Sequence, residues 1–143
     1  MKINPYKFLR YNKHKMMTLR AYWYSAVFRI QILTVKMDKL HKRWGEEGRE
    51  SSEKETDEVY RIAYRVAKEV NRICTKTSWE SKCLVRALTA QKLLKKEGIH
   101  STLYLGCAHD GEKMIAHAWL RCGEVYVTGG DGSGYAMVDK FYA

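Results

Sequence analysis

The sequence predicts an α+β fold, in which N-terminal helices precede a small antiparallel sheet. Apolar residues recur at helical spacing as far as Gly98, and beyond it they alternate with polar residues as in strands. Short turns join the strand-like stretches, as in antiparallel hairpins. The 143 residues fit one domain with a moderate hydrophobic core.

The N-terminal third carries almost all of the excess positive charge. Residues 1–49 hold 12 lysines and arginines against 3 acidic residues, whereas the rest of the chain holds 14 against 13. We therefore divide the chain into a basic helical segment, residues 1–50, and a core, residues 51–143. The basic segment suits nucleic acid, an acidic membrane surface or an acidic protein partner, or it is only a solvated helix face. No motif that reads nucleic acid accompanies it, so we expect no nucleic-acid partner.

Within the basic segment, residues 15–44 have the spacing of one long amphipathic helix. Apolar residues follow one another in steps of four and three and form a stripe on one helix face. The members of this stripe are Leu19, Trp23, Ala26, Ile30, Leu33, Met37, Leu40 and Trp44. We expect the stripe to pack on its own domain, and the alternative is an intermolecular coiled-coil seam.

Two further helices and three strands are expected. Thr56 is the predicted N-cap of a helix that ends at Cys74, and another helix runs from Leu84 to a C-terminal cap at Gly98. The strands are predicted at residues 101–107, 114–121 and 125–128, and a glycine-rich loop follows at residues 129–134. No apolar run is long enough for a transmembrane segment.

Cys83 is the cysteine best placed for nucleophilic chemistry. It lies at the predicted N-terminus of a helix, where backbone N–H groups are unpaired and the helix dipole is positive. Both features favour the thiolate and can bind the oxyanion of a tetrahedral intermediate. Cys74 ends a helix, and Cys107 and Cys122 are expected at strand ends, so these three lack the same placement.

The cysteine pattern also bears on the cellular compartment. No two cysteines form a Cys-x-x-Cys pair, and the N-terminus lacks a secretory signal. We therefore expect four free thiols and a cytoplasmic protein.

His117 is the candidate base. It lies in the middle of a predicted strand, between Ala116 and Ala118. A histidine in an apolar strand is often only a core residue, but with a cysteine at a helix N-terminus it forms a candidate nucleophile–base pair.

Four segments together resemble one enzyme family. Residues 81–88 (SKCLVRAL), 93–99 (LLKKEGI), 103–106 (LYLG) and 116–119 (AHAW) are similar, in order and spacing, to the B-type leader peptidases of lasso peptide biosynthesis. These enzymes are transglutaminase-like cysteine peptidases. The similarity covers about residues 56–130, and its Cys-Leu-x-Arg-Ala and His-Ala-Trp segments are specific in combination.

The resemblance implies a papain/transglutaminase-like core with Cys83 as nucleophile and His117 as base. It implies removal of the leader from a ribosomally made precursor peptide, before an ATP-dependent macrolactam synthetase closes the ring. The residues ahead of the similar region look helical and do not resemble the leader-recognition domain of the family. We therefore expect a separate leader-recognition protein, with the basic segment as its docking surface. No cofactor is implied.

The third catalytic residue of the family has no clear counterpart. The family shows an aspartate about a dozen residues after the histidine, a position that falls near Thr128, and the nearest acid is Asp131. We expect Asp131 to orient His117, and the Thr128 hydroxyl or a backbone carbonyl are the alternatives. Trp79 and Trp119 are candidate substrate-binding residues, although both could simply fill the core.

Other functions remain open at this point. The chain could be a non-catalytic peptide-binding scaffold, or an acyltransferase or transglutaminase on the same core. A metal site formed by Cys83, His109 and His117 is a weaker alternative, because these residues lack the paired spacing of metal ligands.

Overall fold

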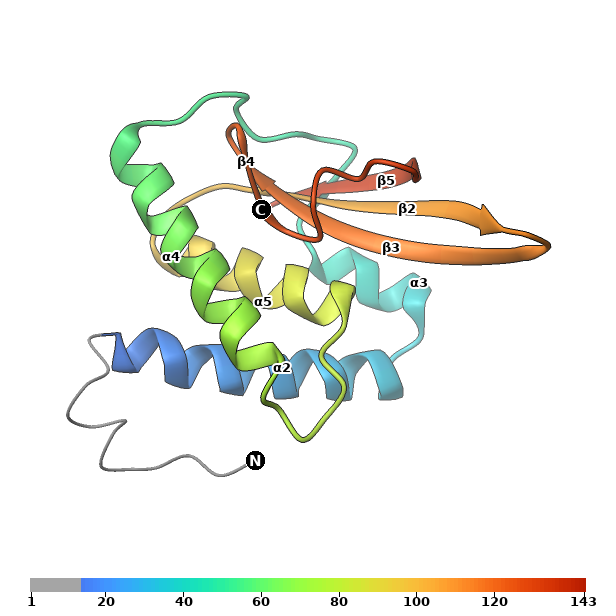
Figure 1. Cartoon of the computed structure of the whole chain (residues 1–143), viewed down its shortest axis with the longest axis horizontal. Helices are drawn as coiled ribbons and strands as arrows, with labels where there is room; N and C mark the ends of the chain where they lie inside the picture. Colours follow the sequence, from blue (N-terminus) through green and yellow to red (C-terminus); the bar gives the residue numbers. More distant parts are fainter. Residues whose placement is uncertain (1–13) are drawn as a thin grey trace.

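Helices precede four of the five strands of an antiparallel sheet in the computed structural model, which describes residues 14–143 (Figure 1). The predicted α+β fold class is therefore confirmed. The helices are α2 (Lys15–Thr34), α3 (Met37–Leu40), the 3-10 helix η1 (His41–Arg43), α4 (Asp57–Cys74) and α5 (Cys83–Lys96). The strands are β1 (Glu46–Glu47), β2 (Thr102–Asp110), β3 (Lys113–Cys122), β4 (Val125–Thr128) and β5 (Ala136–Tyr142). None of the helices within residues 14–143 is long and apolar enough to cross a membrane.

The sheet has the strand order β1-β5-β2-β3-β4. β2 and β3 form a long hairpin that is paired from Thr102 opposite Arg121 to Asp110 opposite Lys113. β4 pairs only with the last residues of β3, from Leu120 onward, so no described strand covers that edge of β3 at its first seven residues. β5 was not predicted, because its sequence, AMVDKFY, does not alternate between apolar and polar residues. In the structure only Phe141 of this strand is fully buried.

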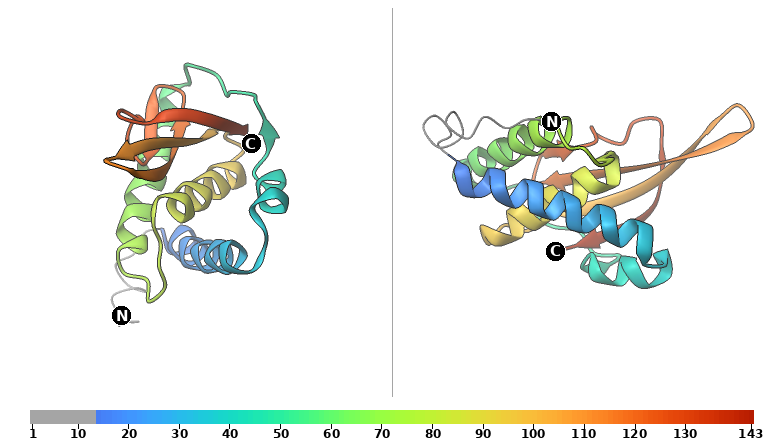
Figure 2. Two further views of the ribbon diagram at one scale, coloured as in Figure 1. Left: turned by 90° about the vertical axis from the view of Figure 1, so that its right-hand side faces the viewer. Right: turned by 90° about the horizontal axis from the view of Figure 1, so that it is seen from below.

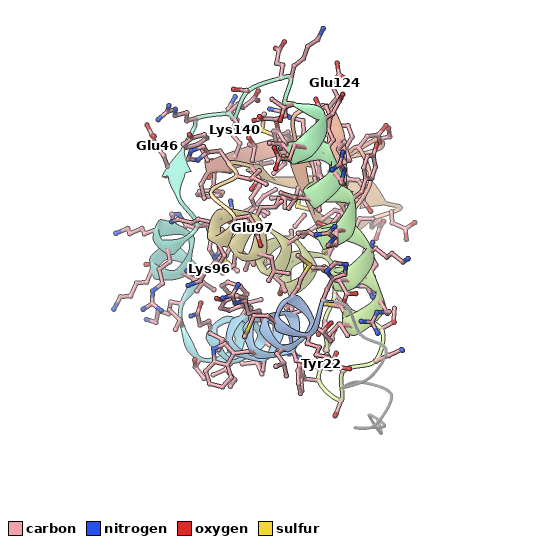
Figure 3. The ribbon with its side chains drawn as sticks, turned by 90° about the vertical axis from the view of Figure 1, so that its left-hand side faces the viewer. Tyr22, Glu46, Lys96, Glu97, Glu124 and Lys140 are labelled. Atoms are coloured by element: carbon pink, nitrogen blue, oxygen red, sulfur yellow. The ribbon has the colours of Figure 1, made fainter. Side chains whose placement is uncertain are left out.

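α5 is the central element of the fold. It lies between the sheet on one side and α2 on the other, with α4 alongside (Figure 2). Figure 3 shows Lys96 and Glu97 at its end, between the sheet and the helix that carries Tyr22. Its buried residues surround the helix axis and are Val85, Ala87, Leu88, Thr89, Ala90, Gln91, Leu93 and Leu94. A helix that is buried all round is held in place by every layer it touches.

α4 begins and ends as predicted and fastens α2 to the domain. The Thr56 hydroxyl accepts a hydrogen bond from the backbone N–H of Val59, at 3.3 Å, so Thr56 is the N-cap. Farther along, the buried Glu69 carboxylate accepts a hydrogen bond from the Thr18 hydroxyl of α2, at 3.0 Å. Arg72 contacts the same Glu69 oxygen at 2.7 Å, so the buried carboxylate is both paired and hydrogen-bonded.

The predicted apolar stripe does not pack on the domain along α2. The residues that α2 buries are Thr18, Ala21 and Ser25, which are small or hydrogen-bonding, whereas Trp23 is 67% and Leu33 66% exposed. Small residues allow α2 to approach α5 closely, and their hydroxyls bond to neighbouring elements. The large apolar residues therefore point outward.

The single helix predicted at residues 15–44 is interrupted after Thr34. The Thr34 hydroxyl donates to the carbonyl of Ile30, at 2.8 Å, and Val35 has the extended backbone of a helix end. The chain then turns, so that Leu40 and Trp44 are buried as expected, with the Trp44 ring 5.4 Å from that of Phe141. The break thus redirects the end of the stripe into the core.

Arg121 ties the loop before α4 to the sheet. Its guanidinium is almost fully buried and donates to the Tyr104 hydroxyl at 2.9 Å and to the Gly123 carbonyl at 2.8 Å. It also donates to the carbonyls of Ser51 and Ser52, each at 3.1 Å. A buried cation with this many acceptors is satisfied, and its removal would leave the acceptors unpaired.

We therefore predict that Arg121→Met lowers the free energy of unfolding by about 2–4 kcal/mol, because several buried acceptors lose their donor. Urea denaturation measures the change. The matched control is Arg61→Met, which removes an exposed arginine of α4 and should leave the denaturation midpoint unchanged. Equal midpoints for the two variants would show that the Arg121 contacts make no net contribution.

Candidate active site

Cys83 is the first residue of the central helix α5. The first hydrogen bond of the helix runs from the N–H of Arg86 to the carbonyl of Lys82, at 2.9 Å. The amides of Cys83, Leu84 and Val85 precede that bond and have no hydrogen-bond partner in the described part of the chain. The first turn of α5 also contains no acidic residue. Free amides without a competing carboxylate favour an anion, such as a thiolate or an oxyanion, at this end of the helix.

The loop before Cys83 is braced by its own hydroxyls. The Thr77 hydroxyl lies 2.9 Å from the Ser81 hydroxyl and donates to the carbonyl of Trp79 at 2.9 Å. Arg86 Nε donates to the Ser81 carbonyl at 2.9 Å, which links the loop to the first turns of α5. The start of α5, and with it Cys83, is therefore held in one position.

Trp79, a predicted substrate-binding residue, is attached to α2. Its indole N–H donates to the Ser25 hydroxyl at 3.2 Å, and Ser25 in turn donates to the Tyr22 carbonyl at 2.9 Å. Its neighbour Glu80 pairs with Lys82 at 2.8 Å and with Arg29 at 3.3 Å. Both cations, Lys82 first, lower the pKa of the Glu80 carboxyl. Trp79 thus braces the loop through its indole N–H. Its half-buried ring is the only part of the side chain that could still contact a substrate.

The other cysteines are less suited to nucleophilic chemistry. All four cysteines are free thiols. Burial raises the pKa of the Cys74 thiol, and it raises the pKa of the Cys122 thiol to about 11. Cys107 lies within β2, away from a helix N-terminus, and not at a strand end as expected. Cys83 alone among them combines partial exposure with unpaired helix amides.

His117 lies on β3 and is oriented by a backbone carbonyl. Its Nε2 lies 2.7 Å from the carbonyl oxygen of Gly129. Because a carbonyl can only accept, Nε2 must carry the proton, and in the neutral ring Nδ1 is then the basic nitrogen. The ring also lies 4.7 Å from that of Tyr135 and 5.9 Å from that of Trp119, between centroids. His117 is therefore held in one tautomer and one orientation.

Glycine is required at position 129. Its φ of 76° is in the left-handed region, and a side chain there would overlap the Ala118 carbonyl oxygen and the Cβ atom of Trp119. Gly132, at φ 78°, lies in the same way against the indole of Trp119. The glycine-rich loop can therefore lie flat on the sheet and present its carbonyl to His117.

The two predicted side-chain orienters of His117 make other contacts. Asp131 is exposed, and its carboxylate accepts hydrogen bonds from the Ser133 backbone at 2.9 Å and from the Ser133 hydroxyl at 2.5 Å. These bonds lower the pKa of the Asp131 carboxyl. The Thr128 hydroxyl is buried and has no hydrogen-bond partner among residues 14–143. The group that contacts the His117 ring nitrogen is instead a backbone carbonyl, which was the third possibility considered for orienting His117.

Cys83 and His117 lie on different faces of the sheet. Ala118 and Leu120 of β3 join the core beneath the helices, so the alternation of the strand places His117 and Trp119 on the other face. There Trp119 stacks on Tyr104, with centroids 5.5 Å apart. Cys83 packs against the helix-side core. Within the described residues, no hydrogen bond joins the Cys83 thiol to His117.

The start of α5 and β3 nevertheless lie close together in the fold. α5 packs directly against β3, and its N-terminal end lies below the middle of that strand (Figure 1). β4 pairs with β3 only from Leu120 onward and does not reach His117. At His117 the glycine-rich loop, and no described strand, therefore covers this edge of β3. Catalytic hydrogen bonds are often long or misaligned before a substrate binds, so the lack of a bond between Cys83 and His117 here is compatible with their pairing.

Cys83 and His117 are a candidate nucleophile and a candidate base, and no cluster in the described part of the chain would hold a metal ion. The structure shows no group of three or more His, Cys, Asp or Glu residues with metal-binding geometry among residues 14–143. The weaker alternative of a metal site formed by Cys83, His109 and His117 therefore has no support in this part of the chain. Acyl transfer through a thiol remains the chemistry that these residues can perform.

Comparison with known proteins agrees with this chemistry. No curated protein and no solved structure matches the chain. A family model described as the transglutaminase-like superfamily matches residues 17–141, which include most of α2, the start of α5 and the whole of β3. The match spans well over half of the chain, and the chain belongs to the transglutaminase-like superfamily.

Proposed function

We propose that the protein is a cysteine peptidase that removes the leader from a ribosomally made lasso peptide precursor. The observation that carries this proposal is Cys83 at the N-terminus of α5, beside three unpaired backbone amides. Membership of the superfamily supports acyl-transfer chemistry of the peptidase or transglutaminase type. The similarity of residues 81–88 and 116–119 to lasso leader peptidases supports the narrower substrate.

In the proposed mechanism, Cys83 attacks the carbonyl carbon of the scissile peptide bond. The thiol proton passes to Nδ1 of His117, while Nε2 keeps its own proton and donates it in the hydrogen bond to the Gly129 carbonyl. The amides at the start of α5 bind the oxyanion of the tetrahedral intermediate. The imidazolium then protonates the leaving amine, which is the new amino terminus of the core peptide. Water hydrolyses the thioester that remains on Cys83, with His117 again as base.

This mechanism requires Cys83 and His117 to meet when the precursor binds. The braced loop at Thr77 and Ser81 holds the start of α5 in place. In the proposal, the part that moves is therefore the glycine-rich loop beside His117. Only the glycine-rich loop covers the open edge of β3 there, and its later residues, 130–134, can move for a bound peptide while the Gly129 carbonyl keeps its bond to His117. The precursor would thus complete the catalytic pair.

The superfamily also supports a second outcome at the same thioester. An amine in place of water would make the protein an acyltransferase or transglutaminase. The mass of the product distinguishes the two, because hydrolysis adds one water to the fragments whereas amine transfer joins the acyl fragment to the amine.

The first functional prediction is that Cys83 is the one cysteine needed for cleavage. Cys83→Ala should reduce cleavage by on the order of 10⁴-fold or more, because the nucleophile is lost. Cleavage of candidate lasso precursors, followed by mass spectrometry, measures the effect. The controls Cys74→Ser, Cys107→Ser and Cys122→Ser should retain activity, apart from losses in stability at the two buried positions.

Alkylation tests the same assignment without a substrate. Iodoacetamide should label Cys83 in the folded protein near neutral pH. Cys122 should stay unlabelled until the pH approaches about 11, because burial raises the pKa of its thiol to that range. Labelling of Cys122 before Cys83, or full cleavage by Cys83→Ala, would contradict the assignment of the nucleophile.

The second functional prediction concerns the orientation of His117. His117→Ala should reduce turnover by several orders of magnitude. Gly129→Ala should reduce it by about tenfold to a hundredfold, because a side chain would displace the carbonyl that holds Nε2. Asp131→Asn should have a much smaller effect, because the Asp131 carboxylate bonds to Ser133. Single-turnover kinetics give the rates. A large loss in Asp131→Asn with little change in Gly129→Ala would make Asp131 the orienting residue.

The third functional prediction is that efficient cleavage requires a separate leader-binding protein. The described residues form one core around α5, and none of them forms a separate peptide-recognition unit. Selection of one bond in one precursor needs binding energy from remote contacts, which a leader-binding protein can supply by raising the local concentration to about millimolar. Cleavage is measured with and without that protein. Rapid, specific cleavage by the peptidase alone would refute the requirement.

A further inference from the structure

The outward face of α2 is a continuous apolar surface. We define this outward face as Met16, Leu19, Trp23, Ala26, Val27, Ile30 and Leu33. At about 100° per residue these side chains fall within an arc of about 120°. The five larger residues Met16, Leu19, Trp23, Ile30 and Leu33 are between 51% and 67% exposed. Soluble proteins seldom expose so many neighbouring large apolar side chains, so the outward face is a binding surface.

No described element covers the outward face. α2 packs on α4 and α5 through its opposite side, where Thr18, Ala21 and Ser25 are buried. Seen from below, α2 crosses in front of the rest of the domain (Figure 2). A straight exposed helix on the outside of the molecule presents a convex ridge, and not a groove that would enclose a peptide.

The charges around the outward face are positive. α2 contains no acidic residue, and the first acid of the whole chain is Asp38. Arg20 and the exposed Lys15 flank the outward face near the start of α2. Lys36 and Lys39 are exposed just beyond the end of α2. This distribution is complementary to an anionic partner.

A second copy of the chain fits these features less well, and so does a protein partner, including the leader-recognition protein for which we expected the basic segment to be the docking surface. Two copies paired through α2 would bring cations against cations. A protein interface commonly carries about one hydrogen bond per 100–200 Å², whereas the outward face has no polar side chain at its centre that could fix a register. A fluid anionic surface needs no register.

We propose that the outward face of α2 binds the surface of an anionic lipid membrane. The helix lies parallel to the bilayer, because its other side is hydrogen-bonded to the domain through Thr18 and Ser25. Trp23 and the aliphatic residues enter the boundary between headgroups and acyl chains. The flanking lysines and arginines contact lipid phosphates. This inference is independent of the proposed peptidase activity.

The experiment is sedimentation of the full chain with vesicles. One set consists of phosphatidylcholine and phosphatidylglycerol in equal amounts, and the other of phosphatidylcholine alone. We expect the protein to sediment with the anionic vesicles and to be released by high salt. Trp23 should show a blue-shifted fluorescence on binding, and Trp23→Phe should keep the binding but lose the shift.

Paired variants assign the binding to the outward face. Trp23→Ser with Ile30→Ser should weaken binding by at least about tenfold, because two apolar side chains that enter the membrane are lost. Lys15→Gln with Lys36→Gln should weaken it about fivefold per charge. The matched control is Tyr64→Ser with Val138→Ser, which removes two residues, each 63% exposed, on α4 and β5. Circular dichroism checks that every variant is folded.

Three results would overturn the proposal. The first is equal binding to both kinds of vesicle, and the second is unchanged binding in the Trp23→Ser, Ile30→Ser variant. The third is no binding of the wild type to anionic vesicles. If the Trp23→Ser, Ile30→Ser variant then also loses its response to a leader-binding protein, the outward face is assigned to a protein partner.

Discussion

The burial of α5 on all sides is the constraint on which the rest of the structure depends. α5 touches the sheet, α4 and α2, and its buried residues point in every direction around its axis. A helix so enclosed cannot slide without disturbing three layers at once. Its N-terminus, which carries Cys83, is therefore as fixed as the core itself, and the unpaired amides at that end are presented in a constant direction. Preorganised donors of this kind are what oxyanion stabilisation requires.

The same constraint explains the two faces of α2. Because α5 separates α2 from the sheet, α2 can bury only the side that meets α4 and α5. That side consists of small and hydroxyl-bearing residues, which approach closely and bond to Glu69 and Trp79. The large apolar residues have no third layer within the described chain to cover them. An apolar stripe in a sequence indicates a helix face that favours burial, but it does not show what covers that face.

The sequence could predict the elements that depend on local chemistry. The Thr56 cap, the Gly98 end of α5 and the β2–β3 hairpin all follow from residues close together in the chain, and all are present. Cys83 at the first position of α5 belongs to the same class. The inward side of α2 could not be predicted, because Thr18 and Ser25 also bond to partners more than 50 residues away, Glu69 and Trp79. β5 was missed for a related reason, since its position depends on pairing with β2 and not on its own pattern.

The orientation of His117 shows why a catalytic constellation is harder to infer than its members. His117 was recognisable from its setting between small residues, but its contact is a backbone carbonyl, which every residue possesses. What distinguishes Gly129 is the close approach to Ala118 and Trp119 that excludes a side chain, and such a property exists only in the folded chain. A carbonyl also differs chemically from a carboxylate: it fixes the tautomer of the imidazole but adds no full negative charge to stabilise the imidazolium. A pair oriented in this way depends more strongly on the substrate to bring nucleophile and base together. That dependence fits the proposed leader peptidase, because a precursor that completes the site also selects the bond to be cut.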